Sequence, residues 1–196
     1  MATRARDRLV ETAGRLFYTE GIRAVGVERL LTDSGVGRAS FYRHFAGKDD
    51  LVATVLRQRD VKWRQNLEKS VAEHGGGPLA VFDALGAMHE NGDCHGCSFN
   101  NAVAETAGTD DVVRRLAVAH KNAVADYIKG LLAGAGYSAR LGEDGMDELA
   151  WRFVLLVDGA SMASVRDGSS APARRARAMA EILLNAAESG ETERSG

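Results

Sequence analysis

Residues 38–48 contain polar and cationic side chains that could contact a nucleic acid. On a helix predicted from about Gly37 to His44, Phe41 and the next residue, Phe45, are four positions apart, so they share one face that we expect to be buried. The opposite face then presents small, hydroxylated, aromatic and cationic side chains to solvent. Such a face suits the major groove of DNA. Its members are Arg38, Ala39, Ser40, Tyr42, Arg43 and His44.

Arg38 is the strongest candidate for a contact with a base, because a guanidinium can bind O6 and N7 of guanine with two hydrogen bonds. Ser40 can bind either a base edge or a phosphate, and Ala39 can pack on a thymine methyl group. The alternative for each of these side chains is an ordinary solvated surface position. Among all the candidate DNA-contacting residues, the surface alternative is strongest for Arg43 and for Glu28.

Two further positions flank this segment. Lys48 comes just before the next predicted helix, whose free N–H groups favour a phosphate. Val27 and Glu28 begin the preceding helix and are expected near the DNA backbone.

A short helix and a tight turn must position these residues. Over residues 27–33, Val27, Leu30 and Leu31 lie on one side, the spacing of a packed helix. Gly35 then stands where the end of a helix needs a residue that tolerates a positive φ. The pattern predicts two short helices around a turn. The alternative is a helical hairpin inside a larger bundle, without a role in DNA binding.

The segment Gly-Val-Gly-Arg-Ala-Ser-Phe-Tyr-Arg-His-Phe-Ala-Gly-Lys-Asp-Asp-Leu, residues 35–51, resembles the DNA-binding signature of TetR-family transcriptional regulators. With a preceding helix that ends in Leu16-Phe17 and a turn at Gly21, the resemblance covers about residues 5–55. It implies that Tyr42, His44 and Lys48 contact the phosphate backbone. The chain departs at Gly37, where the family often has a Ser or Thr cap, and glycine is a weaker cap.

The fold class predicted from the whole chain is all-α. Alternating β-branched runs and Asn-Gly hairpins are absent from the sequence, whereas helical periodicity recurs. The pattern predicts nine helices, which is the number in the TetR-like architecture. They are expected at about residues 4–20, 27–33, 37–44, 48–73, 78–91, 98–106, 110–133, 146–165 and 172–188.

We divide the chain into a DNA-binding domain, residues 1–47, a helical ligand-binding and dimerisation domain, residues 48–188, and a disordered tail, residues 189–196. Charge supports the division. Residues 1–64 contain 13 lysines and arginines against 8 acidic residues, a net +5, and residues 65–196 contain 12 against 19, a net −7. A basic first part is typical of a module that binds nucleic acid.

The last two predicted helices carry more apolar surface than a small domain buries easily. Residues 149–157 are apolar on nearly all sides, and an apolar stripe follows along residues 176–187. A partner subunit is the simple explanation, and TetR-like proteins dimerise through these helices as a four-helix bundle. The alternative is a helix central to its own bundle. The expected dimerisation residues are Phe153, Leu156, Ala160, Met179, Leu183 and Leu184.

A small-molecule inducer is expected because TetR-like proteins bind one between their fourth and eighth helices. An aromatic lining with a few polar groups is typical of such a pocket, and equally typical of a core. Since any such pocket lies beyond Trp63, the fourth helix is expected to carry its signal to the DNA-binding domain. The candidate residues are Trp63, Phe82, Met88, Phe99, Asn101, Glu105, Tyr127, Trp151 and Asp158.

Cys94-His95-Gly96-Cys97 could suggest metal or redox chemistry. A structural zinc site needs four ligands and no second cluster has suitable spacing, so we expect neither a metal nor a cofactor. A thioredoxin-like role needs a βαβ context that is absent from the pattern. Cys97 begins a segment resembling one in some TetR-like regulators, including electrophile-sensing ones, and a thiol at a helix N-terminus is more reactive. The alternative is a small buried apolar side chain.

The sequence therefore predicts a homodimeric repressor that binds a palindromic operator in double-stranded DNA and is released by a small molecule. A thiol switch at Cys97 is the alternative trigger, and an architectural DNA-binding protein is the alternative class. Motifs of common enzymes, such as G-x-S-x-G and H-E-x-x-H, are absent, so we expect no enzyme activity. With two cysteines, no long apolar run and no apolar leader, we expect a cytoplasmic protein without a membrane span.

Overall fold

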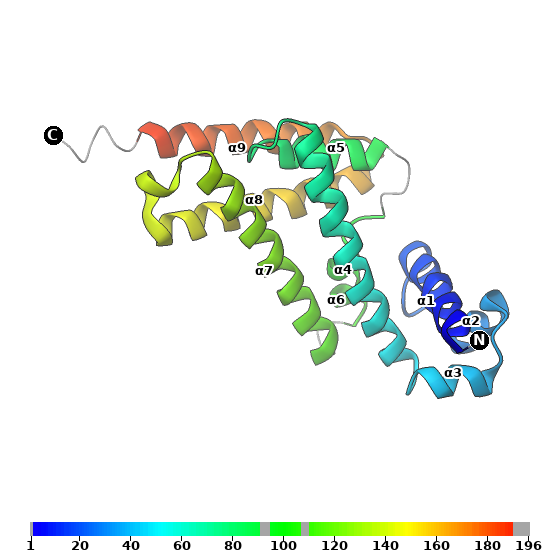
Figure 1. Ribbon diagram of the computed structural model, residues 1–196. Helices are drawn as coiled ribbons and strands as arrows, with labels where there is room; N and C mark the ends of the chain where they lie inside the picture. The colour runs from blue at the N-terminus through cyan, green and yellow to red at the C-terminus, as the bar shows by residue number, and fades with distance from the viewer. Residues whose placement is uncertain (1, 91–94, 107–109, 190–196) are drawn as a thin grey trace. The chain divides into compact units, whose positions relative to one another are not determined.

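The structure, a computed structural model, describes residues 2–90, 95–106 and 110–189, which form nine helices and no strand, as predicted (Figure 1). Within these ranges no helix is both long enough and apolar enough to cross a membrane. The helices are α1 (Ala2–Thr19), α2 (Val27–Ser34), α3 (Arg38–His44), α4 (Lys48–Glu73), α5 (Ala80–Glu90), α6 (Ser98–Glu105), α7 (Asp111–Gly134), α8 (Ser138–Asp167) and α9 (Ala171–Ser189).

The helices belong to two compact units. The first unit contains Met1–Trp63 and Ser98–His120, and the second contains Arg64–Cys97 and Lys121–Gly196. The continuous helices α4 and α7 therefore each contribute residues to both units. The functional boundaries predicted at residues 47 and 188 remain predictions, and the predicted tail lies almost wholly outside the described residues.

In the first unit, apolar side chains of α1, α2, α3 and the beginning of α4 form one core. Leu9, Leu16, Leu30, Phe41 and Leu51 are all completely buried there. Because α1 packs against both α2 and α3, it supports the two short helices of the turn motif. Burial of this apolar surface is the main source of their stability, since helices of seven or eight residues are marginal in water.

Gly35 makes the turn between α2 and α3 possible. Its φ of 62° and ψ of 30° place it in the left-handed region at the C-terminal end of α2. There the N–H of Val36 donates to the carbonyl of Leu31 at 3.3 Å, as in a Schellman motif. The predicted positive φ is confirmed, and this turn sets the angle at which α3 leaves α2.

The first unit also contains α6 and the beginning of α7. Glu105 at the end of α6 accepts a hydrogen bond from the backbone N–H of Arg23, with an N···O distance of 2.7 Å. His120 of α7 is buried, its Nδ1 lies 2.7 Å from Oδ1 of Asp60 on α4, and its ring stacks on Phe99 of α6 at 4.1 Å. These polar and ring contacts attach α6 to the segment just before α2, and attach α6 and α7 to α4.

In the second unit, α8 and α9 pack side by side, and α5 packs against both (Figure 1). The rings of Phe82 and Phe153 are buried with their centroids 5.5 Å apart. Ion pairing adds to this packing, because Arg177 Nε of α9 lies 3.1 Å from Asp83 Oδ2 of α5. The apolar pattern on α8 and α9 therefore supplies a core within the chain itself.

The beginning of α8 differs from the prediction. A loop was expected across residues 134–145, with the helix beginning at Met146, but helical structure begins at Ser138. Gly142 interrupts it with a φ of 66° and a ψ of −176°. The glycine therefore produces a local break between two helical segments rather than a complete loop, because helical hydrogen bonding resumes immediately after it.

Replacing Gly35 with Ala is expected to lower the free energy of unfolding by about 1–2 kcal/mol, because an L-residue is strained in this conformation. A clash is not the cause, since a Cβ would have only Arg8 Nη1 near it, at 3.9 Å. Urea denaturation followed by circular dichroism measures the change. Gly130→Ala is the control: it lies inside α7 with open space around a Cβ, so stability should rise by about 0.5–1 kcal/mol. Equal effects of the two replacements would contradict this explanation.

Candidate nucleic-acid interface

The seven-residue helix α3 has a buried face and an exposed face. Phe41 and Phe45 are 0% and 2% exposed, and their ring centroids are 5.9 Å apart. Gly37 begins the helix in an extended conformation without a side-chain cap, and Phe45 ends it. The burial of both phenylalanines confirms the predicted inner face and fixes which side of α3 points to solvent.

The outer face carries the polar and cationic residues expected there. Arg38, Ala39, Tyr42 and Arg43 are exposed, and Ser40 is half-buried. Arg43 Nη2 donates to Ser40 Oγ at 3.0 Å, so these two side chains occupy adjacent positions one turn apart. The exposed face of α3 therefore carries hydrogen-bond donors along its length.

Arg38 has a partner that the sequence did not predict. Its guanidinium forms an ion pair with Glu28 of α2, through Nη2 and Oε1. Both side chains are exposed, at 58% for Arg38 and 72% for Glu28. Their ten-residue separation, across a turn, has no helical periodicity that would have signalled the contact. Val27 beside Glu28 is half-buried.

His44, at the end of α3, and Lys48, at the beginning of α4, are both half-buried. Nε2 of His44 is buried and has no hydrogen-bond partner among the described residues. The Nζ atom of Lys48 lies 6.0 Å from the centre of the Phe17 ring, and burial lowers the pKa of this lysine. Both positions therefore combine a polar tip with packing against the core. Sequence analysis missed Arg6 of α1, whose guanidinium lies 5.6 Å from the ring of Phe45 and adds a cation beside α3.

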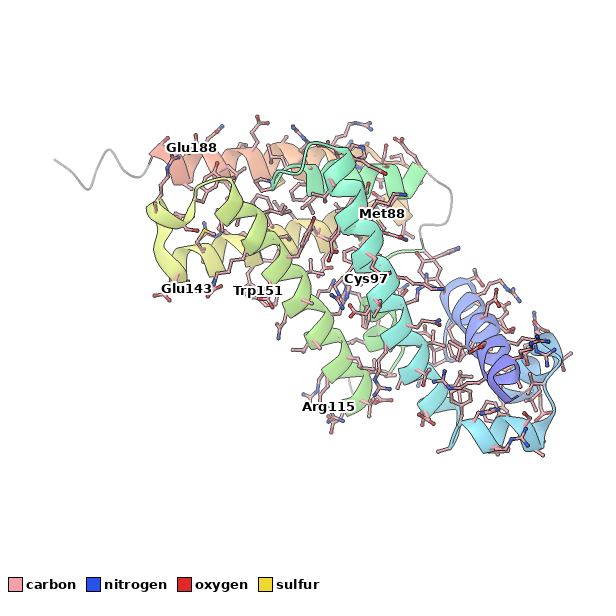
Figure 2. The ribbon with its side chains drawn as sticks, in the orientation of Figure 1. Met88, Cys97, Arg115, Glu143, Trp151 and Glu188 are labelled. Atoms are coloured by element: carbon pink, nitrogen blue, oxygen red, sulfur yellow. The ribbon has the colours of Figure 1, made fainter. Side chains whose placement is uncertain are left out.

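The residues predicted to bind a small molecule are divided between the two units. Trp63, Phe99, Asn101 and Glu105 belong to the first, and Phe82, Met88, Tyr127, Trp151 and Asp158 belong to the second. Phe82 and Phe99 are buried. Trp151 on α8, labelled in Figure 2, is 41% exposed, which fits a surface contact better than the lining of an enclosed pocket.

Asn101 and Glu105 do come together, in a small pocket of the first unit. Side chains of α1, α4 and α6 line it, including Phe17, Tyr18 and Arg59. Arg59 Nη1 donates to the carbonyl of Gly14 at 3.1 Å, and its guanidinium stacks over the ring of Tyr18 at 3.6 Å. The pocket wall is therefore built in part from the helix that supports the turn motif.

A second cluster of reactive groups lies in the second unit. Cys97, labelled in Figure 2, directly precedes α6 and is half-buried. The Nζ atom of Lys121 lies 3.5 Å from Cys97 Sγ and also forms an ion pair with Asp158 of α8. Asp158 was predicted only as a ligand-binding residue, and its partner Lys121 was missed because α7 offers several equivalent cations. Cys94, the other cysteine, lies outside the described residues.

The predicted dimerisation residues differ in exposure. Phe153, Ala160 and Leu184 are buried inside the second unit, Leu156 and Leu183 are half-buried, and Met179 is 56% exposed. Buried members already pack within this chain and are not free to contact a partner. The large apolar side chains that α8 and α9 leave exposed are Trp151, Leu155, Met162, Val165, Met179 and Ile182.

Sequence comparison finds relatives of the turn-motif segment. The family model described as bacterial regulatory proteins, tetR family, matches residues 9–55. Over 56 residues the chain is 39% identical to an HTH-type transcriptional regulator of Staphylococcus aureus strain USA300. A regulator of the same kind from strain NCTC 8325 gives the same identity. The match spans 29% of this chain and about 30% of the length of these curated relatives.

Comparison with solved structures extends the similarity to nearly the whole chain. A putative TetR transcriptional regulator of Streptomyces avermitilis is 26% identical with a TM-score of 0.76, covering 94% of this chain and 98% of that one. A TetR-family transcriptional regulator of Streptomyces coelicolor is 32% identical with a TM-score of 0.79, covering 94% of this chain and 90% of its own. With that identity over most of both chains, and with the turn motif matched, this chain belongs to the TetR family of transcriptional regulators.

Proposed function

We propose that the chain is a repressor that binds a palindromic operator as a homodimer and leaves it when a small molecule binds. The observation that carries the proposal is the outer face of α3, where exposed Arg38, Tyr42 and Arg43 stand above the buried Phe41. In a dimer the two copies of α3 are expected about 34–36 Å apart, one turn of B-DNA. The proposed contacts are bases for Arg38, Ala39 and Ser40, and phosphates for Tyr42, His44 and Lys48.

The exposed apolar side chains of α8 and α9 support the homodimer. Trp151, Leu155, Met162 and Val165 recur at intervals of three, four or seven residues along α8 and share one side of that helix. Met179 and Ile182 add a second exposed pair on α9. Because α8 and α9 pack side by side, we propose that these groups form one two-helix apolar surface, of the kind that marks an interface. A second copy of the chain is its proposed partner.

Two triggers for release are considered. The first is a small, largely apolar molecule, for which the pocket beside α1, α4 and α6 is the support. The second is a thiol switch at Cys97, favoured by the ammonium of Lys121 at 3.5 Å, since a neighbouring cation stabilises the thiolate. The thiolate would add to the β-carbon of an α,β-unsaturated ketone. A C–S bond forms, the C=C π pair moves to the α-carbon, and that carbon takes a proton from water.

Replacing Arg38 with Ala is expected to weaken binding to the selected operator by about 1–3 kcal/mol and to relax preference at one base in each half-site. Lys48→Met, which keeps the aliphatic stem beside Phe17, should instead weaken binding to all duplexes and reduce the salt dependence. Fluorescence anisotropy over a series of salt concentrations measures both effects. A uniform loss of affinity in both variants would contradict the proposed roles.

Replacing Leu155 with Asp should weaken dimerisation more than about a hundredfold, because each copy would bury an unpaired charge at the interface. Leu155 is 70% exposed in the single chain, so the fold itself should tolerate the change. Sedimentation equilibrium at micromolar concentration measures the oligomeric state. The matched control is Val118→Asp on α7, another exposed apolar residue, at 55%. A wild-type monomer at these concentrations would overturn the homodimer.

The two triggers are separated by Cys97→Ser. We expect a metabolite found in a thermal-shift screen to release operator DNA equally from the wild type and from this variant, because the pocket does not need the thiol. An α,β-unsaturated ketone should then release no more than a few per cent of the operator DNA from either protein. If the ketone releases only the wild type, with one adduct on Cys97 by mass spectrometry and no metabolite acting, the thiol switch replaces the pocket.

A further inference from the structure

The ion pair between Glu28 and Arg38 joins the two helices of the turn motif at the surface proposed to meet DNA. Glu28 is the second residue of α2 and Arg38 is the first residue of α3. The backbone between them is held by the left-handed turn at Gly35 and by the buried side chains of Leu30 and Phe41. The backbone positions of both residues are therefore fixed by the core, and their two exposed side chains meet across the turn.

We infer that Glu28 is a positioning residue that sets base preference, by orienting the guanidinium of Arg38 for guanine. The inference rests on the proposed operator binding. It differs from the role given to Glu28 by the sequence alone, which placed it near the DNA backbone. A carboxylate is repelled by phosphates, so a role through the arginine also explains why an acid is compatible with this surface.

The chemistry of the guanidinium supports these two roles, positioning by Glu28 and base contact by Arg38. Its five N–H donors lie in one plane, and Glu28 engages Nη2. The remaining donors are sufficient for the two parallel hydrogen bonds that bind O6 and N7 of guanine. An arginine held by one partner loses less conformational freedom on binding, and the carboxylate also disfavours a rotation of Arg38 toward a nearby phosphate. The expected consequence is a stronger preference for guanine at one position of each half-site.

The chain offers a matched control on the same helix. Asp33 of α2 is exposed and pairs with Arg29, with Oδ2 and Nε 2.8 Å apart, and Arg29 also lies near Glu20 at 3.5 Å. Removal of Asp33 therefore eliminates one negative charge from α2 without disturbing the pair at Arg38. Any effect common to Asp33→Ala and Glu28→Ala is an effect of net charge alone.

The experiment begins with wild-type protein and a pool of random-sequence duplexes, from which it selects its preferred palindrome. Relative affinities are then measured for every single base substitution in one half-site, repeated symmetrically in the other. The position assigned to Arg38 is the one whose guanine preference collapses in Arg38→Ala. At that position Glu28→Ala is expected to reduce the preference about fivefold, and other positions should change by less than about twofold. Glu28→Gln, which keeps an oxygen acceptor, should fall between Glu28→Ala and the wild type.

Glu28→Ala is also compared in the wild type and in the Arg38→Ala variant. In the Arg38→Ala background, Glu28→Ala should have no further effect on base preference, because Glu28 acts on the base through the arginine. A change at a different position that persists in that background would show direct contact with a base, and would overturn the inference. A uniform gain of affinity on all duplexes, matched by Asp33→Ala, would reduce Glu28 to a repulsive charge and would also overturn it. Failure of the wild type to select any sequence would instead contradict the proposed function itself.

Discussion

The burial of Phe41 and Phe45 is the interaction on which the rest of the interface depends. A helix of seven residues without a side-chain cap does not persist in water, so α3 exists because its aromatic face packs against the core. The same burial determines that Arg38, Tyr42 and Arg43 point outward. It also explains the ion pair, because Glu28 meets Arg38 only while Leu30 and Phe41 hold α2 and α3 in the core that they share with α1. Stability and the proposed recognition of DNA therefore depend on one set of apolar contacts.

The fold was largely predictable because its signals are local. Apolar spacing within each helix and glycines at helix ends locate elements from short stretches of chain, and nine helices were predicted and found in the described residues. The exception is the beginning of α8, where Gly142 and Gly145 suggested a loop. Gly142 does leave the helical region, but the residues on both sides of it are helical. A glycine pattern indicates where a break is tolerated and does not by itself determine how long the break is.

At the candidate interface, the sequence predicts which side chains are exposed to solvent but not which polar side chains contact one another. The periodicity that buries Phe41 necessarily exposes Arg38, so which side chains face solvent follows from the sequence. Which side chains contact one another does not follow from the sequence. Arg23 and Glu105, for example, are 82 residues apart, and no local pattern joins them. The same is true of Asp60 and His120, 60 residues apart, and of Lys121 and Asp158, 37 apart. Long-range polar contacts depend on helix packing, which short patterns do not contain.

These contacts also limit how the proposed release could operate. A thousandfold loss of operator affinity requires about 4 kcal/mol of coupling between the two sites. The hydrogen bond from the Arg23 N–H to Glu105 is charge-assisted but lies at the surface, and such a bond contributes about 1–2 kcal/mol. Breaking it alone is therefore insufficient. The contacts of Phe99 on α6 with His120 on α7, and of His120 with Asp60 on α4, would have to change with it, since they also hold α6 in place. We therefore expect the signal to pass through α6 as well as α4, with several contacts changing together rather than one acting as a switch.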